Sequence, residues 1–384
     1  MQKTDIAILG GGIAGLWLLN LLAKRGYSVL LVEKEALGSG QTIASQGMIH
    51  GGIKYALGGF LSDASETIAA MPARWQACLA GQGTLDLSAV RTLAQDYFLF
   101  SDAKLSSRVT AFLGSKAIES RVTRVGESDR PEVLRNDEFK GRVYKLQDFV
   151  LDTRSLVEEL ARPFQNRIHT GSFNLRVEAG KIAAIELDDN SSISARQYIL
   201  AAGQGNGELI KQLNLPVTMQ LRPLKQVIVT GPDLPRLYAH AVSLKAGGKP
   251  RLTITTHYLD DGAPCWYLGG QLAETGVEQS DQALIAQARS ELQSLLSWVD
   301  FSNCSYRTLS INRAEPSQKH QKRPDEPYAE QFGNTLVCWP TKMTLAPLLG
   351  DKVDDLLQFT PEQTADIHLS RPVSLATSPW SIGS

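Results

Sequence analysis

The sequence predicts a chain of mixed class, α/β plus α+β, in which a domain with parallel strands is joined to one with a mainly antiparallel sheet. The first part rests on residues 5–35, which alternate a short apolar run, a helical run and a second apolar run, the pattern of a βαβ unit. The second part rests on residues 211–315, where several strand-like runs accompany one helical segment, 280–296. That combination is typical of an antiparallel sheet covered by a helix.

Size and composition are those of an ordinary globular protein. The chain has 384 residues, 43% of them hydrophobic and 21% charged, which suggests two or three domains. A formal net charge of −1 gives no electrostatic reason to bind nucleic acid. The four cysteines are far apart and form no CxxC pair, so neither a metal site nor a disulfide framework is expected. Reduced thiols in a cytoplasmic enzyme are the simplest interpretation.

The two ends of the chain carry little further information. The first residues run directly into a strand and lack the basic region and cleavage site of a signal peptide. No apolar run approaches the about 20 residues that a membrane span needs, although peripheral membrane contact stays open. The last residues, 377–384, are expected to be loosely ordered.

A dinucleotide-binding signature lies inside the βαβ unit. Gly10, Gly12 and Gly15 form a G-x-G-x-x-G motif between the first strand and the helix, and the second strand ends at Glu33. Such glycines allow the tight turn, the approach of a pyrophosphate and close packing of the helix, while the acid accepts hydrogen bonds from ribose hydroxyls. We expect nucleotide contacts from Gly10, Gly12, Ile13, Ala14, Gly15, Glu33 and Lys34.

The loop after Glu33 favours FAD over NAD. Residues 38–52 are rich in glycine, serine and threonine instead of returning to an ordinary alternation of strands and helices. Many backbone and hydroxyl donors suit a dinucleotide that is buried and held permanently, more than a nicotinamide that exchanges at every turnover. From this loop we expect FAD contacts by Thr42, Ser45, Gln46 and Gly47.

A strand that ends in Ala201-Ala202-Gly203 adds a family resemblance. Residues 193–206 resemble the element that returns the chain to the FAD domain in the D-amino-acid oxidase superfamily of FAD-dependent oxidoreductases. Four further stretches resemble blocks of that family in the expected order: 149–161, 221–229, 266–276 and 341–353. The resemblance implies a Rossmann-like FAD-binding domain, with contacts from Ala202 and Gly203, and a mainly antiparallel-sheet substrate domain. It assigns 1–85, 146–210 and 316–384 to the FAD-binding domain, and 86–145 and 211–315 to the substrate domain.

Two histidines are candidates for catalysis. His50, in "SQGMIHGGIKYAL", resembles a run found in glycerol-3-phosphate dehydrogenases and L-2-hydroxyglutarate oxidases; His257, in "TTHYLDDGAPCWYLGG", resembles a second patch of the latter. Both branches oxidise a carbon that bears a hydroxyl, and a base with a pKa near the working pH removes the hydroxyl proton best. We expect His257 to be the base and His50 to contact flavin or substrate. The reverse order, a covalent bond from His50 to the flavin, and a purely structural role for either ring stay open.

Positive charge is expected beside the flavin and the substrate. The turn "WPTKMTLAP" lacks the glycines of the family. Three roles stay open for Lys342 in this turn: it supplies positive charge to the flavin N1/C2=O edge, it binds a substrate carboxylate, or it is a surface lysine. Met343 and Thr344 are expected to contact FAD. Arg313, in "INRAEP", is the preferred partner of a substrate carboxylate, and Arg222 is a weaker candidate.

The resulting hypothesis is an FAD-dependent oxidoreductase that oxidises a small 2-hydroxy acid or a related hydroxyl compound by hydride transfer to flavin N5. The electron acceptor, whether oxygen, a quinone or another carrier, is left open. One alternative is an amine or amino-acid oxidase of the sarcosine or glycine oxidase kind on the same fold. A second alternative is a non-catalytic FAD-binding subunit whose partner subunit supplies the substrate site.

Overall fold

The computed structural model describes residues 2–53, 67–101, 121–242, 250–362, 369 and 372–381. Tyr55 and the end of the "SQGMIHGGIKYAL" run lie outside these residues. In the described residues the first of two large sheets is formed by β1 (Gln2–Leu9), β2 (Val29–Glu33), β9 (Ile168–Thr170), β10 (Phe173–Glu178), β11 (Lys181–Leu187), β12 (Ser192–Leu200), β18 (Tyr328–Phe332) and β19 (Thr335–Trp339).

Parallel pairing makes up the centre of this sheet. β1 pairs in parallel with β2 on one side and with β12 on the other, and β9 and β19 extend the parallel region outward. β10 and β11 form an antiparallel hairpin at one edge, joined through Ala179 and Gly180, both of positive φ. Parallel strands place their carboxyl ends at one edge of the sheet, so the turn after Leu9 and the end of β12 at Leu200 meet there.

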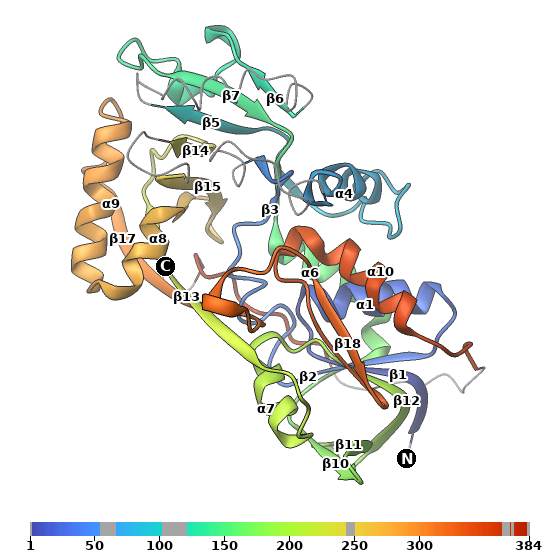
Figure 1. The fold of residues 1–384 in the computed structure, drawn as a ribbon. Helices are drawn as coiled ribbons and strands as arrows, with labels where there is room; N and C mark the ends of the chain where they lie inside the picture. The colour runs from blue at the N-terminus through green and yellow to red at the C-terminus, as the bar shows by residue number, and fades with distance from the viewer. Residues whose placement is uncertain are drawn as a thin grey trace.

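Helices cover one face of the first sheet, as Figure 1 shows for α1 (Ile13–Lys24), α6 (Thr153–Ala161) and α10 (Ala346–Leu356). Alternate residues of β1 point to opposite faces. Ile6 and Ile8 pack in the core below these helices, whereas Ala7 and Leu9 pack in a second core with β10, β11 and α7 (Asn206–Gln212). Burial on both faces explains the continuous apolar run of β1.

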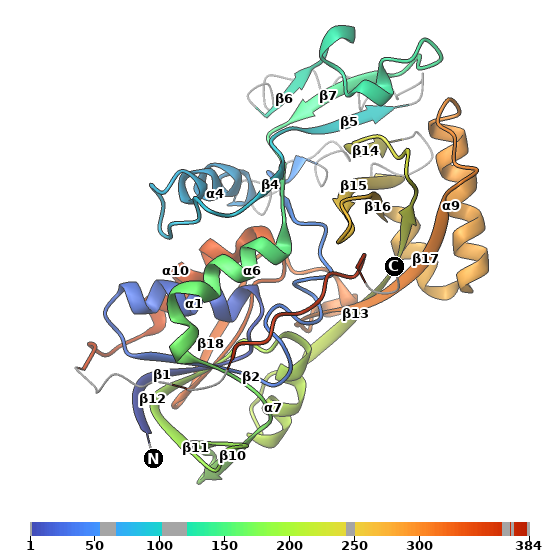
Figure 2. The same cartoon turned by 180° about the vertical axis from the view of Figure 1, so that it is seen from behind.

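The second large sheet is almost wholly antiparallel; among its described strands, β14 and β5 are the one pair that runs in parallel. In spatial order its described strands are β17 (Ser305–Pro316), β13 (Met219–Thr230), β16 (Pro264–Gly269), β15 (Leu252–Tyr258), β14 (Tyr238–Val242), β5 (Tyr97–Ser101), β7 (Arg142–Leu146) and β6 (Val122–Arg124). The helix α9 (Asp281–Leu295) covers this sheet with Leu284, Ala288 and Leu292, which share one helix face at a spacing of four (Figures 1 and 2).

Smaller elements connect the two sheets. β3 (Met48–Ile49), β8 (Phe149–Leu151) and β4 (Thr92–Ala94) form a short antiparallel sheet, and α4 (Met71–Leu79) lies beside it (Figure 2). The mixed α/β plus α+β class predicted from the sequence is confirmed. Strands of the first sheet come from residues 2–33, 168–200 and 328–339, a distribution that the predicted discontinuous domains would produce.

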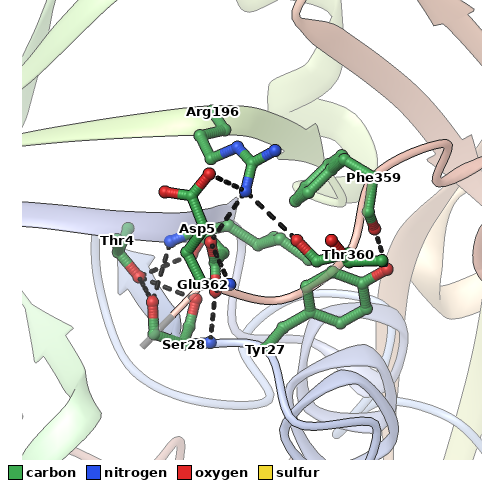
Figure 3. A network of polar contacts seen from close by, with 9 residues as sticks. Thr4, Asp5, Tyr27, Ser28, Arg196, Phe359, Thr360 and Glu362 are labelled. Atoms are coloured by element: carbon green, nitrogen blue, oxygen red, sulfur yellow. Dashed lines mark hydrogen bonds and ion pairs between the residues drawn. The ribbon is translucent and has the colours of Figure 1, made fainter. Parts of the chain in front are cut away.

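A buried carboxylate ties the amino-terminal end of β1 to the segment after α10 (Figure 3). Asp5 is fully buried, and its Oδ2 accepts the Ser28 N–H at 3.0 Å and the Glu362 N–H at 3.3 Å. Arg196 of β12 lies 3.5 Å from Asp5 Oδ1 and stacks over the Phe359 ring at 4.2 Å. These contacts satisfy the carboxylate at the end of the sheet opposite the glycine-rich turn.

The prediction of a loosely ordered tail is wrong for its described residues. Just before the tail, Leu37 N–H donates to Ser374 O at 2.8 Å and Ala376 N–H donates to Leu37 O at 3.0 Å, so residues 374–376 pair with the loop after β2. Trp380 is only 5% exposed and packs among Ile228, Cys265 and Tyr267 of the second sheet. Apolar burial of the tryptophan outweighs the polar composition around it.

Candidate functional site

The glycine-rich turn between β1 and α1 is closed so tightly that only glycine fits at two positions. A Cβ on Gly10, whose φ is +115°, would lie 2.5 Å from Ala202 Cα, and a Cβ on Gly15 would lie 1.9 Å from Gly10 O. The turn, the first residues of α1 and the end of β12 are therefore in close contact. Gly12, Ile13, Ala14, Ala202 and Gly203 border one cavity at this place.

Side chains of the neighbouring loops fix the turn. Glu33 Oε2 accepts the Gly11 N–H at 2.6 Å, and Glu33 Oε1 accepts the Glu35 N–H at 3.0 Å. Thr42 Oγ1 accepts the Ile13 N–H at 3.0 Å, so the loop after β2 touches the first turn of α1. Glu33 thus supports the turn itself, while Lys34 is exposed to solvent.

The cavity has a volume of about 840 Å³ and lies where the two large sheets approach each other. It is bordered by many of the residues predicted from the sequence, namely Gly12, Ile13, Ala14, Thr42, Ser45, Gln46, His50, Ala202, Gly203, Arg313, Lys342, Met343 and Thr344. Its lining does not include Gly10, Gly15, Glu33, Lys34, Gly47 and His257. Gly47 instead accepts the Leu151 N–H at 2.8 Å and links the loop to β8.

A dinucleotide fits this cavity. The glycine-rich turn brings the backbone at the N-terminus of α1 to the cavity wall, where peptide N–H groups and the helix dipole favour phosphate. The N-cap residue of α1 is Gly12, which has no side chain of its own at the helix N-terminus. The volume lies in the upper part of the range for ligand pockets, about 300–1,000 Å³. Gly12, Ile13 and Ala14 would hold the diphosphate, and Ser45, Gln46 and Thr344 border the rest of the cavity.

His50 is positioned by hydrogen bonds on both sides of its backbone. Its own N–H donates to Thr344 Oγ1 at 3.2 Å, next to the N-terminus of α10. The following N–H, that of Gly51, donates to Asp148 Oδ1 at 2.8 Å. His50 is 5% exposed and borders the cavity. The imidazole is therefore carried on a segment that two distant elements hold in place.

Gln46 joins the loop to the second sheet. Its Nε2 donates to Tyr267 O at 2.9 Å and to Thr255 Oγ1 at 3.2 Å. Tyr267 Oη in turn lies 3.0 Å from Ala44 O and 2.8 Å from Gln226 Oε1. Strands of the second sheet thus hold residues of the loop that borders the cavity.

Three guanidinium groups border the other side of the cavity. Arg222 and Glu315 form an ion pair between β13 and β17, and Arg313 Nε donates to Arg222 O at 3.3 Å. Burial, followed by the charges of Arg222 and Arg323, lowers the pKa of Arg313 to about 10. Arg313 therefore remains positively charged at neutral pH, in an environment that favours an anion.

Lys342 lies in the turn before α10 and is 6% exposed. Its Nζ donates to Pro324 O at 3.3 Å and to Asp325 O at 3.2 Å. The sequence alternative of a surface lysine is thus wrong, because the side chain is buried against the loop that carries Arg323. Met343, the next residue, contacts Ser45 Oγ through its sulfur at 3.7 Å.

The structure does not bring His257 to the cavity. His257 shares a face of β15 with Thr253 and Thr255, but Thr253 borders the cavity whereas His257 lies further along the strand beneath Trp380. Its Nε2 is 3.0 Å from Thr255 Oγ1, and burial lowers its pKa to about 3. The role of His257 as the base stays a prediction that this placement does not support.

Several residues of the site carried no recognisable signal in the sequence. Arg323 lies in a polar loop, and only the folded chain places it at the cavity beside Arg313. Asp148 follows β7 and reaches Gly51 from a distant part of the chain. Among the described residues there is no cluster of acidic, histidine and cysteine side chains able to hold a metal ion, and no helix long and apolar enough to cross a membrane.

Comparison with known proteins gives the family. The family model described as "DAO: FAD dependent oxidoreductase" matches residues 5–308. A Pseudomonas aeruginosa protein named "probable FAD-dependent oxidoreductase PA4991" is 44% identical over 386 residues, covering 99% of this chain and 98% of its own. The crystal structure of the FAD dependent oxidoreductase PA4991 from that organism superposes with a TM-score of 0.86 at 40% identity, again over 99% and 98% of the two chains.

More distant relatives agree on the fold. An aerobic glycerol-3-phosphate dehydrogenase of Staphylococcus haemolyticus is 25% identical over 252 residues, 59% of this chain and 43% of that protein. Glycine oxidase from Geobacillus kaustophilus has a TM-score of 0.67 at 17% identity, covering 100% and 99% of the two chains, which shows the fold alone. The chain therefore belongs to the DAO family of FAD-dependent oxidoreductases, and FAD is its cofactor.

Proposed function

We propose that the chain oxidises a small 2-hydroxy acid, or a related hydroxyl compound with an anionic group, in the cavity that His50 and Arg313 share. The proposal rests on this shared cavity. His50 and Arg313 both border it, and so do residues of the loops that would hold FAD. Bound FAD supplies the hydride acceptor of the reaction.

His50 would take the proton of the substrate hydroxyl. Oxidation of a carbon that bears a hydroxyl leaves a carbonyl, so the hydroxyl proton must be removed, and imidazole is the side chain best suited to do so near neutral pH. The hydrogen bonds at His50 N and Gly51 N fix the backbone that carries the ring. This proposal exchanges the two roles expected from the sequence, since His257 does not border the cavity.

Arg313 would bind and orient the anionic group of the substrate. The charge of Arg222 is offset by Glu315, whereas Arg313 forms no ion pair with a carboxylate in the described residues. A substrate carboxylate would complete the pairing through charge-assisted hydrogen bonds.

An amino acid carries the same group, so an amine or amino-acid oxidase remains the second candidate. The weak likeness to glycerol-3-phosphate dehydrogenase supports the hydroxyl substrate.

Anaerobic mixing of the FAD-loaded protein with paired substrates tests this function. Each 2-hydroxy acid is compared with the amino acid of the same carbon skeleton and with its N-methyl derivative, and loss of the visible flavin absorbance is followed. We expect bleaching by hydroxy acids. Bleaching by the amines alone would overturn the proposal in favour of the second candidate, and bleaching by no compound would favour a subunit that needs a partner.

The variant His50→Gln tests the role of His50 in the same experiment. The variant removes the base while its amide keeps hydrogen-bonding capacity, so FAD should stay bound while reduction slows by about 10²–10⁴-fold. An unchanged reduction rate in His50→Gln would remove the assigned role of His50 even if hydroxy acids are substrates.

A further inference from the structure

The segment that carries Arg323 is held by an unusually complete set of side-chain donors. It runs from Lys322 to Pro327 and connects β17 with β18. Five of its backbone carbonyls accept a hydrogen bond from a side chain of another element. The donors are Gln220 Nε2 to Lys322 O at 2.9 Å, Lys342 Nζ to Pro324 O and Asp325 O, Thr341 Oγ1 to Glu326 O at 3.2 Å, and Lys352 Nζ to Pro327 O at 3.1 Å.

Lys342 is the buried member of this set. Its ammonium group makes two hydrogen bonds to the segment and lies 3.9 Å from the carboxylate of Asp325. A buried ammonium ion needs such partners, because moving it out of water without them is costly. Two of its three protons are therefore directed at the backbone on either side of the Pro324–Asp325 peptide bond, next to Arg323.

Arg323 is the residue of this segment that we consider for ligand binding, because it borders the cavity. Arg323 and Arg313 both border it, and Arg222 borders it as well. The positive charge of Arg323 is felt at Arg313, since it is one of the causes that lower the pKa of Arg313. The carboxylates of Glu274 and Glu315 act on Arg313 in the opposite direction. Two guanidinium groups that border one cavity attract an anion, and planar guanidinium forks suit carboxylates.

We propose that Arg323 binds the anionic group of the substrate together with Arg313, and that Lys342 is a positioning residue that fixes Arg323 by clamping the Lys322–Pro327 segment. This inference rests on the proposed oxidation of an anionic substrate in the same cavity. It gives Lys342 a role different from a contact with the flavin or with the substrate. It also assigns a binding role to Arg323, which no sequence motif indicates.

Three single variants and one double variant test the proposal on the FAD-loaded protein. They are Arg323→Gln, Lys342→Met, Lys342→Arg and the double variant Arg323→Gln/Lys342→Met, with Lys322→Gln as the matched control. Lys322 is the exposed neighbour of Arg323, so its replacement removes a charge from the same segment without touching the cavity lining. Binding of oxalate, a dicarboxylate that carries no hydroxyl carbon to oxidise, is measured from the change in flavin absorbance and gives a readout independent of turnover.

We expect Arg323→Gln to weaken oxalate binding and raise the substrate KM by about 10- to 100-fold, with kcat changed far less. FAD affinity and the flavin reduction potential should stay at the wild-type values. Lys342→Met should give the same split between KM and kcat, Lys342→Arg should restore part of the affinity, and Lys342→Met should add little in the Arg323→Gln background. Trypsin should cut after Lys322 faster in Lys342→Met, because the segment has lost the two hydrogen bonds from the Lys342 ammonium group.

Three results would overturn the inference. Unchanged oxalate affinity in Arg323→Gln would show that Arg323 does not bind the anion. Loss of FAD in Arg323→Gln would assign this arginine to the cofactor phosphates. A shifted reduction potential in Lys342→Met, with full effect in the Arg323→Gln background, would place the ammonium group at the flavin. Failure of the proposed function looks different, since wild-type protein would then not be reduced by any hydroxy acid, whatever the variants do with oxalate.

Discussion

Trp380 stacks on His257, with 3.9 Å between the ring centroids and 21° between the ring planes. The edge of Tyr267 faces the same imidazole, with its ring centroid at 6.1 Å, so two aromatic rings enclose the histidine. An imidazole enclosed in this way is well suited to packing and poorly placed to reach a substrate. The carboxyl-terminal tail, which supplies Trp380, therefore favours a packing role for His257 over a catalytic one.

Replacement of His257 by phenylalanine tests this interpretation directly. Phenylalanine keeps a ring against Trp380 and removes the ring nitrogens, so flavin reduction by the substrate should stay within a few-fold of wild type, measured by anaerobic stopped-flow absorbance. A general base at this position would instead cost about 10²–10⁴-fold. A loss of that size in His257→Phe, with FAD still bound and the melting temperature unchanged, would restore His257 as the base.

His257 also makes stability depend on pH. Burial lowers its pKa to about 3, from about 6.5 in the unfolded chain. Between these values the unfolded chain binds a proton that the folded protein does not, so the free energy of unfolding falls as the pH falls from about 6.5 towards 3. The loss from this one group should reach about 2 kcal/mol between pH 7 and pH 5.

Urea unfolding of wild type and His257→Phe at these two pH values isolates the contribution. The variant should lose less stability than wild type on acidification, by about the 2 kcal/mol assigned to the imidazole. If both proteins lose the same free energy of unfolding on acidification, then protonation of the His257 imidazole is not the cause of the loss.

Gly15 should be essential for holding the cofactor. A Cβ at this position would lie 1.9 Å from Gly10 O, so Gly15→Ala must push α1 away from the turn that borders the cavity. We expect FAD affinity to fall by at least about tenfold and stability to fall by about 1–3 kcal/mol. Gly126→Ala is the matched control, because a Cβ there meets nothing within 4 Å and its φ is −70°. Equal FAD titrations for both variants would show that the turn tolerates the displacement.

The sequence was most informative where function depends on neighbouring residues. The βαβ unit, the glycine spacing and the polar loop after Glu33 could be located because each is a local pattern, and the structure places residues of all three together at the cavity. Residues 280–296 were expected to be helical from their periodicity, and α9 spans Asp281–Leu295.

Other features depend on contacts between distant residues and could not be found in this way. His257 was correctly placed on a strand, but whether the cavity extends to it depends on where Trp380 packs, and no local pattern encodes that contact. The same holds for Arg323, whose position follows from donors on β13 and on the chain from Thr341 to Lys352. Lys342 was recognised as a charge near the flavin turn, yet its partners lie in a loop whose course the sequence does not indicate.

Asp148 provides the last test, because its carboxylate accepts the backbone N–H of the residue that follows His50. Its side chain is 1% exposed and its Oδ1 accepts the Gly51 N–H at 2.8 Å. Asp148→Asn keeps the shape and one acceptor oxygen but removes the charge that strengthens the bond, so kcat should fall by about 3- to 10-fold, with about 1–2 kcal/mol lost in stability. Asp148→Ala should cost more in both quantities, since it leaves the buried N–H without this acceptor. If both variants lose stability but keep the wild-type kcat and its pH profile, then Asp148 supports the fold without positioning His50.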